Sequence, residues 1–330
     1  LTWPRRFDKT LTLSMLRYFV DLAGADAHRQ LFDGLAVSHD AAMMAEMGQR
    51  PVLFFTLRGW KARDWEEMKG TIAIGLQKVA KQYKFLLESD RVDSHDRSIL
   101  KSIYEGHASL MQLRTAPELL LGMLEAHYDK KAVLLLDEYD TPIQTAWEYG
   151  YYNEAIDFFR VFLTTALKTN LSLDFAVMTG VLRISKESIF SDLNNLFVDS
   201  ILRPKYPTVF GFTSEEVEKM ANDLGHVDKL PEIKAWYDGY RIDGHEIYNP
   251  WSVLNYFDAG CQPQTYWGNT SGNAILAELM KSADQEHFES LDTLLRGGTV
   301  TSYLRDGVIY SDIGDDPDAL CTMLCTTGYL

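Results

Sequence analysis

Three short runs of apolar residues stand out along the chain, and each has the length of a buried strand. They cover residues 51–57, 132–136 and 175–178, and they are apolar at successive rather than alternate positions. A strand inside a parallel sheet has this pattern because helices cover both of its faces. The three runs therefore predict neighbouring strands of one parallel sheet.

Around these runs the apolar residues recur every three or four positions, which is helical spacing. We predict a helix that begins at Lys9, and further helices over 65–83, about 92–109, 115–128 and 153–167. In the helix over 115–128, Thr115 is a capping residue and Pro117 an early proline, both typical of a helix start. Strands that alternate with helices predict the α/β class, with a parallel sheet flanked by helices.

The pattern changes near Phe212. Thr213 and Glu216 fit a capping box that opens a new helix, and aromatic, turn-rich segments follow at 236–240 and 248–252. We place a domain boundary here, between a core of residues 1–212 and a smaller helical domain of residues 213–330. The aromatic segments favour packing in and around this small domain over stacking on a base or a sugar.

Composition and charge narrow the possible functions. Of the 330 residues 46% are hydrophobic, and the formal net charge of −15 repels a phosphate backbone, so we expect no direct nucleic-acid binding. Apolar runs fall short of the roughly eighteen residues that span a bilayer, and a leader pattern is absent, so no membrane contact is expected. Three cysteines without ligand-spaced histidines indicate free thiols in a reducing, cytoplasmic setting and no structural metal site.

The first candidate site is the heptapeptide PRRFDKT at residues 4–10. A lysine followed by a hydroxyl residue at a helix start is how phosphate-binding loops hold a triphosphate and its Mg²⁺. Arg5 and Arg6 would offset the phosphate charge or pair with Asp8. The alternative is that Lys9 and Thr10 only open an ordinary helix. Such a loop normally follows a buried strand, and only three residues precede it here, so we expect most of that strand to be missing.

The second and third candidates lie where two of the predicted strands end. Asp137 and Glu138 follow the run 132–136; an aspartate there can bind Mg²⁺, and a glutamate beside it can orient and activate a water molecule. Thr179 follows the next run and is placed to sense a γ-phosphate, and Arg183 beyond it can reach the phosphates or the two carboxylates. The alternatives are two solvated carboxylates at a strand end and an ordinary surface arginine.

With these residues in hand, the chain resembles the predicted AAA-ATPase-like family of bacterial P-loop proteins, which is related to the STAND-type signalling ATPases. The matching segments are 4–7, 9–11, 136–142, 179–191, 193–195, 210–213, 236–240, 248–252 and 266–267. The resemblance implies a P-loop NTPase core, a helical lid with a winged-helix-like region, and ATP and Mg²⁺ as cofactors. Members often carry a PD-(D/E)XK-type nuclease domain after the ATPase part, so we expect a nuclease or another effector outside this chain.

The resemblance also assigns roles to individual residues. It makes Lys9 and Thr10 the Walker A residues, and Asp137 and Glu138 the Walker B residues. The candidate nucleotide-binding residues are Arg5, Arg6, Phe7, Asp8, Lys9, Thr10 and Leu11. The candidate magnesium ligands are Thr10 and Asp137, and the candidate catalytic residues are Glu138, Thr179 and Arg183.

The chain departs from the family at Asp8, where the family has glycine. The carboxylate adds Coulomb repulsion near a phosphate, and the Cβ resists the backbone geometry that glycine adopts. Two functions therefore stay open: an ATP-hydrolysing switch that regulates an effector, and a scaffold for protein contacts whose nucleotide site is impaired. A nuclease within these residues is disfavoured by the net charge and by the absence of an acid–lysine constellation.

Overall fold

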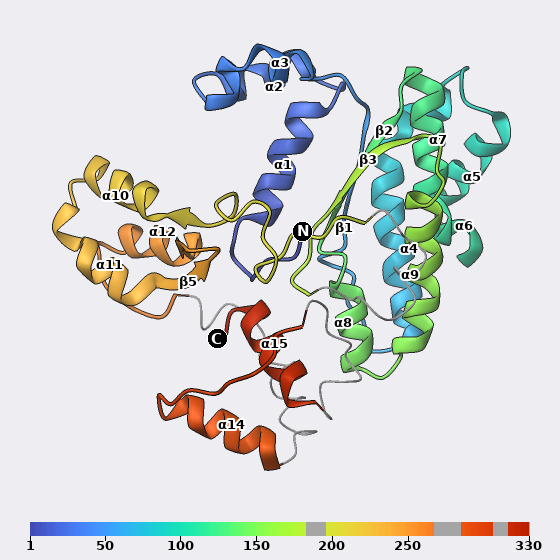
Figure 1. The fold of residues 1–330 in the computed structure, drawn as a ribbon. Coiled ribbons are helices and arrows are strands. Elements are labelled where there is room, and N and C mark those ends of the chain that lie inside the picture. Colours follow the sequence, from blue (N-terminus) through green and yellow to red (C-terminus); the bar gives the residue numbers. More distant parts are fainter. Residues whose placement is uncertain (183–195, 267–284, 306–315, 330) are drawn as a thin grey trace. The chain divides into compact units, whose positions relative to one another are not determined.

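The computed structural model of the protein describes residues 1–182, 196–266, 285–305 and 316–329 (Figure 1). The chain divides into two compact units. The first, the parallel-sheet unit, consists of Thr10–Gly180 and, among the later described residues, Leu196. The second, the antiparallel-sheet unit, consists of Leu1–Lys9, Val181, Leu182 and the described residues from Phe197 onward. The domain boundary expected after Phe212 stays a prediction.

The first unit is built on a three-stranded parallel sheet. Its strands are β1 (Val52–Thr56), β2 (Ala132–Asp137) and β3 (Leu173–Met178), hydrogen-bonded in the order β1-β2-β3. The three predicted strands and their parallel pairing are confirmed. β2 is buried along its whole length, whereas β3 is mostly half-buried, because β2 lies between the other two strands of the described sheet.

Helices cover both faces of this sheet (Figure 1). On one face Leu13 and Val20 of the first helix belong to a core cluster with Val133 and Leu135 of β2. On the other face the ring of Phe55 in β1 contacts the ring of Phe162 in α9 (Tyr152–Leu167). The α-helices of this unit are α1 (Lys9–Val20), α2 (Ala25–Arg29), α3 (Ala41–Ala45), α4 (Trp65–Gln82), α5 (Ser94–Glu105), α6 (Leu110–Arg114), α7 (Ala116–Tyr128), α8 (Thr141–Glu148) and α9 (Tyr152–Leu167).

The helix predictions are confirmed, with one correction at the start of α7. Thr115 precedes the helix, but its side chain makes no capping hydrogen bond there. Its hydroxyl instead donates to the carbonyl oxygen of Met111, at 3.3 Å. The cause is α6, which runs directly into Thr115 and offers its last carbonyl groups to the hydroxyl.

The second unit contains a sheet that was not predicted from the sequence. Its strands β4 (Phe212–Thr213), β5 (Asp238–Ile242) and β6 (His245–Tyr248) pair antiparallel in the order β4-β6-β5. Asp243 and Gly244 join β5 to β6, and both have positive φ, 48° and 83°. An Asp-Gly pair is typical of a two-residue hairpin turn, so the sequence carried a signal for this hairpin that the expectation of a small helical domain left out.

The helices of the second unit lie between and after these strands along the chain. They are α10 (Ser214–Asp223), α11 (Leu230–Tyr237), α12 (Pro250–Asp258), α14 (Gln285–Leu295) and α15 (Pro317–Thr327). The predicted capping box at the start of α10 is confirmed, since the hydroxyl of Thr213 accepts from Glu216 N–H and the Glu216 carboxylate accepts from Thr213 N–H. The winged-helix-like character of this region stays a prediction.

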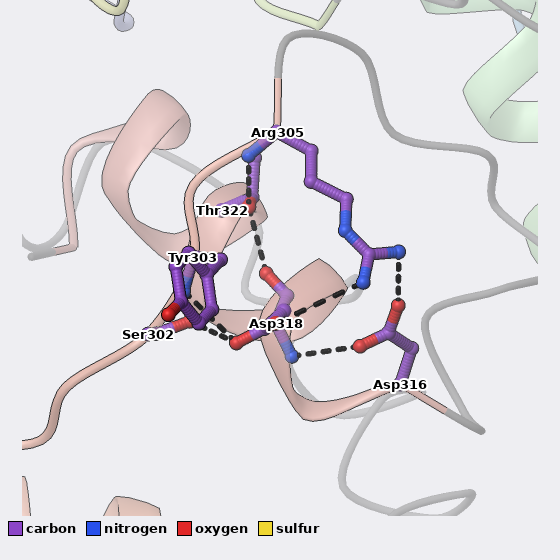
Figure 2. Close-up of polar contacts among 6 residues, drawn as sticks. All are labelled: Ser302, Tyr303, Arg305, Asp316, Asp318 and Thr322. Atoms are coloured by element: carbon purple, nitrogen blue, oxygen red, sulfur yellow. Dashed lines mark hydrogen bonds and ion pairs between the residues drawn. The ribbon is translucent and has the colours of Figure 1, made fainter.

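Polar side chains fix the segment 302–305 against the start of α15 (Figure 2). Asp316 caps the helix and pairs with Arg305 at 2.5 Å. Asp318 accepts hydrogen bonds from the Ser302 hydroxyl at 2.8 Å and from Tyr303 N–H at 3.0 Å. These bonds, together with the charge of Arg305, hold the pKa of Asp318 below its usual range.

Two further properties concern the whole described chain. In the part of the protein that the structure describes, no helix is long and apolar enough to cross a membrane. Cys261, Cys321 and Cys325 are free thiols.

Candidate functional site

The candidate phosphate-binding loop closes on its own lysine. Lys9 opens α1, and its ammonium group donates hydrogen bonds to the carbonyl oxygens of Trp3, at 2.8 Å, and Pro4, at 2.7 Å. The lysine is buried although it is charged, with 8% of its surface exposed. A charged group in such a place needs polar partners, and the two loop carbonyls provide them. The loop therefore curves around the lysine, as a phosphate-binding loop does.

The backbone of the loop alternates in handedness. Arg6 and Asp8 have positive φ, 66° and 52°, whereas Phe7 between them does not. Positive φ is uncommon for residues with a Cβ, although aspartate tolerates it better than most. Alternating conformations of this kind turn successive N–H groups toward one side and form a concavity that binds anions. Asp8 thus adopts the conformation for which glycine is usually required.

The carboxyl group of Asp8 remains the unfavourable part of this loop for an anion. Partial desolvation raises its pKa, and the nearby charge of Lys9 opposes this shift. The residue as a whole stays exposed. Asp8 is therefore a carboxylate that faces solvent at the rim of the loop and has the loop's own lysine beside it.

Two aromatic residues anchor the loop in the core of the antiparallel-sheet unit. Trp3 and Phe7 are fully buried in a cluster with Phe210 and with residues of β5 and β6. The indole N–H of Trp3 donates to the buried carboxylate of Asp199 at 3.0 Å. The ring of Phe7 meets Tyr240 edge-on, with 4.8 Å between the centroids. Phe7 can therefore offer a phosphate only its backbone.

The anchoring aspartate was not found from the sequence. Asp199 also accepts hydrogen bonds from the backbone N–H groups of Lys205, at 2.6 Å, and Tyr206, at 3.2 Å. Its position follows no motif or spacing that links it to the loop, which lies almost two hundred residues away. Only the folded chain brings it to Trp3.

At the carboxyl end of β2, Asp137 is the centre of a hydrogen-bonded group in the parallel-sheet unit. The hydroxyl of Thr179 donates to its Oδ1 at 2.6 Å, and the hydroxyl of Thr10 donates to its Oδ2 at 2.8 Å. Asp137 and Thr179 are both 1% exposed. The structure thus brings together three residues predicted from separate segments of the chain, because α1 begins at the edge of the sheet where β2 and β3 end.

Glu138, next to this group, has a strained backbone and a shifted pKa. Its φ is 53°, in the left-handed region that glutamate rarely adopts. Burial raises its pKa, and the charges of Asp137 and Asp140 raise it further, whereas Arg58 and a hydrogen bond from Thr141 act in the opposite direction. A carboxylate that holds a proton more tightly than usual is a better general base near neutral pH.

Arg58 is a second residue that the sequence analysis missed. Its Nε lies 3.9 Å from Glu138 Oε1, and its side chain is largely exposed. β1 pairs with β2 in parallel, with Thr56 opposite Asp137, so a residue just after β1 lies beside one just after β2. The parallel pairing of the two predicted strands would have indicated that Arg58 lies near Glu138.

The remaining predicted site residues are Leu11, Arg5 and Arg183. Leu11 lies on α1 with 58% of its surface exposed. Arg5 is half-buried, and its carbonyl oxygen accepts a hydrogen bond from the Asn249 side chain at 3.4 Å. Arg183 and the motif that follows it, at residues 184–195, lie outside the described residues.

The oxygen atoms around Asp137 are of the kind that would hold a magnesium ion if a nucleotide brought one. Mg²⁺ prefers oxygen ligands and usually keeps waters and phosphate oxygens in its shell, so it needs only one or two protein groups. The hydroxyl of Thr10 and the carboxylate of Asp137, already 2.8 Å apart, are such a pair. Among residues 1–182, 196–266, 285–305 and 316–329 there is no group of three or more histidine, cysteine or acidic residues that would hold a metal by itself.

A parallel sheet flanked by helices, with a lysine-closed loop before the first helix, defines a P-loop-like protein of the α/β class. The family described as predicted AAA-ATPase matches residues 1–190. The chain belongs to this family, which supports nucleotide binding in general terms.

The comparisons with a curated relative and with solved structures say less about function than the family match does. A protein of Azotobacter chroococcum mcd 1, described as an uncharacterized protein in the vnfD 5′ region, is 29% identical over 282 residues. The match covers 85% of this chain and 48% of the relative, so the chain spans about half the length of the relative it matches. No solved structure matches the chain.

Proposed function

We propose that this protein binds ATP with Mg²⁺ and hydrolyses it. In this proposal the N–H groups of the loop and the ammonium group of Lys9 bind the β- and γ-phosphates. Thr10 and Asp137 hold the magnesium ion, which neutralises phosphate charge. Glu138 orients and deprotonates the attacking water, while Thr179 fixes Asp137 and, with Arg183, senses the γ-phosphate.

The observation that carries the proposal is the conformation of the loop. Left-handed residues at Arg6 and Asp8, with Lys9 held by loop carbonyls, support a phosphate-binding concavity in a loop that has no glycine. Strained left-handed conformations of residues with a Cβ cluster at functional sites, because the fold elsewhere must hold them. An ordinary helix start does not require this conformation.

The test is a thermal unfolding titration with ATP and MgCl₂. A ligand present at about a hundred times its Kd stabilises the folded state by about 2.7 kcal/mol. For a chain of this size we expect an increase of about 5 °C in Tm. Lys9→Ala should abolish the shift, and Lys101→Ala, a change at an exposed lysine of α5, should leave it intact. No shift for the wild type at millimolar ATP would refute nucleotide binding.

One observation favours the second candidate function, a scaffold with an impaired nucleotide site. Asp8 places a carboxylate at the rim of the loop, where its charge opposes that of a phosphate. This candidate predicts that the wild type shows no ATP-dependent shift and that Asp8→Gly restores one. The same titration therefore separates the two functions.

We further propose that nucleotide turnover switches the lid and regulates an effector, such as a nuclease domain, in the cytoplasm. The relative from Azotobacter chroococcum supports this by its length, since about half of it lies outside the match. Deleting the part of the relative that lies outside the match and comparing ATP turnover with and without it would test the coupling. Equal turnover in both proteins under all nucleotide conditions would argue against it.

A further inference from the structure

The start of α12 contacts the candidate phosphate-binding loop through two side chains, both within the antiparallel-sheet unit. The amide of Asn249 donates to the Arg5 carbonyl oxygen at 3.4 Å. The guanidinium of Arg6 lies over the ring of Trp251, with 4.5 Å between its central carbon and the ring centroid. The aromatic segment at 248–252 is therefore a neighbour of the loop as well as part of the small domain.

Both contacting side chains are themselves held in place. Asn249 is 6% exposed, and its Oδ1 accepts from the backbone N–H of Ser252 at 3.1 Å, which caps α12. The indole N–H of Trp251 donates to the carbonyl oxygen of Tyr266 at 3.3 Å. The amide and the ring thus present fixed surfaces to the loop.

The contacts also fix the carbonyl groups of the loop. The carbonyl oxygens of Trp3 and Pro4 accept from Lys9, and that of Arg5 accepts from Asn249. An anion site formed by N–H groups needs carbonyl oxygens that are turned away and bound elsewhere, because their partial charges repel an anion. Asn249 completes this arrangement at the residue just before Arg6.

Stacking on Trp251 leaves the donor groups of Arg6 available. A guanidinium carries its five N–H donors in its own plane, so an aromatic ring against its face does not use them. A phosphate can then bind at the edge of the guanidinium with two parallel hydrogen bonds. The positive φ of Arg6 and the ring together define where that edge lies.

We propose that Trp251 is a positioning residue that holds Arg6 in the orientation in which it binds the phosphates of the nucleotide. This inference rests on the proposed nucleotide-binding function and names a part of the same site. Trp251 does not itself contact the nucleotide; it acts through Arg6.

The test is a double-mutant cycle on the Kd for ATP–Mg²⁺, measured by titration calorimetry on the full chain. The variants are Trp251→Leu, Arg6→Ala and the double variant. Loss of the stacking should weaken binding by about three- to tenfold, the range expected of a partly exposed cation–π pair. Because Trp251 acts through Arg6, Trp251→Leu should have no further effect once Arg6 is alanine.

Two more variants separate positioning from structural damage. Trp251→Phe keeps an aromatic face and should retain most of the affinity, even if Trp251→Leu proves unstable. Trp236→Leu removes another tryptophan of this unit, half exposed on α11, and should leave the Kd unchanged.

The outcomes distinguish the inference from the function on which it rests. A wild type that binds no ATP refutes both. A wild type that binds ATP, with Trp251→Leu equal to it or with independent, additive effects of Trp251→Leu and Arg6→Ala, refutes the positioning role alone.

Discussion

Replacing Asp8 with glycine removes two effects at once, a strained backbone and a negative charge beside the proposed phosphate site. At φ 52° an aspartate lowers the stability of the fold by about 1 kcal/mol relative to glycine, which adopts positive φ readily. Glycine also gains more freedom in the unfolded chain, by a similar amount. We therefore expect Asp8→Gly to change the free energy of unfolding by less than about 1 kcal/mol at neutral pH.

The effect on ATP affinity should be larger. Two unit charges about 4 Å apart repel by about 1 kcal/mol in water and by about 4 kcal/mol at the effective dielectric constant near a protein surface. Because Asp8 is exposed, the lower half of this range applies, about 1–2 kcal/mol. This corresponds to a Kd for ATP that is roughly five to thirty times lower in Asp8→Gly.

The pH dependence provides a second measurement. Desolvation raises the pKa of Asp8, so the carboxyl group takes up a proton as pH falls toward that value, and the repulsion disappears. The ratio of the wild-type Kd to the Asp8→Gly Kd should therefore approach one with falling pH, while titration of ATP itself affects both proteins equally. Calorimetric titrations of both proteins at several pH values give this ratio.

A matched control isolates the backbone contribution. Asp129 at the end of α7 is also an exposed aspartate with positive φ, 55°, but it lies outside the loop. Asp129→Gly should change stability as Asp8→Gly does and leave the Kd for ATP unchanged. If Asp8→Gly bound ATP no better than the wild type at any pH, the charge of Asp8 would not oppose ATP binding.

Three other substitutions probe the carboxyl end of β2. Glu138→Gln should lower kcat at least about a hundredfold while keeping ATP binding, measured by phosphate release and calorimetry. Glu138→Gln should also stabilise the fold at neutral pH. Because the pKa of Glu138 is raised, the folded state binds the proton more tightly than the unfolded state, and ionisation of Glu138 lowers the stability of the wild type as pH rises through that pKa. Below the usual pKa of a glutamate the variant should no longer be more stable than the wild type. Thr179→Val removes the 2.6 Å hydrogen bond to buried Asp137 and should destabilise by about 1–3 kcal/mol in urea unfolding. Gly180→Ala would place a Cβ 2.7 Å from the ring of Tyr139 and should cost about 1–3 kcal/mol in the same assay.

Controls for the last two are available nearby. Thr10→Val removes a more exposed hydroxyl from Asp137 and should cost less stability than Thr179→Val. Gly122→Ala, inside α7, meets only the Ser172 hydroxyl at 3.9 Å and should stabilise by up to about 1 kcal/mol. Equal losses for Thr10→Val and Thr179→Val, or tolerance of alanine at Gly180, would contradict the geometry described for this edge.

The parts predicted correctly share a physical origin. β1, β2 and the helices around them follow from local periodicity, since a buried strand must be apolar along its length and a surface helix on one face. Asp137 and Thr179 were also predictable, because parallel strands place their carboxyl ends at one edge. The hairpin of β5 and β6 was missed although Asp243 and Gly244 signal it.

The sequence by itself determined the class of the fold, the family, and the identity of Lys9, Thr10, Asp137 and Glu138 as candidates, because each depends on residues close together in the chain. Only the tertiary structure decided how a loop without glycine holds its shape. Trp3 and Phe7 enter a core formed by residues some two hundred positions away, Asp199 fixes one of them, and Asn249 and Trp251 bind the arginines between them. Such contacts depend on long-range packing, which local spacing in a sequence does not encode. That packing holds Asp8 in the left-handed conformation that the sequence alone counted as an objection.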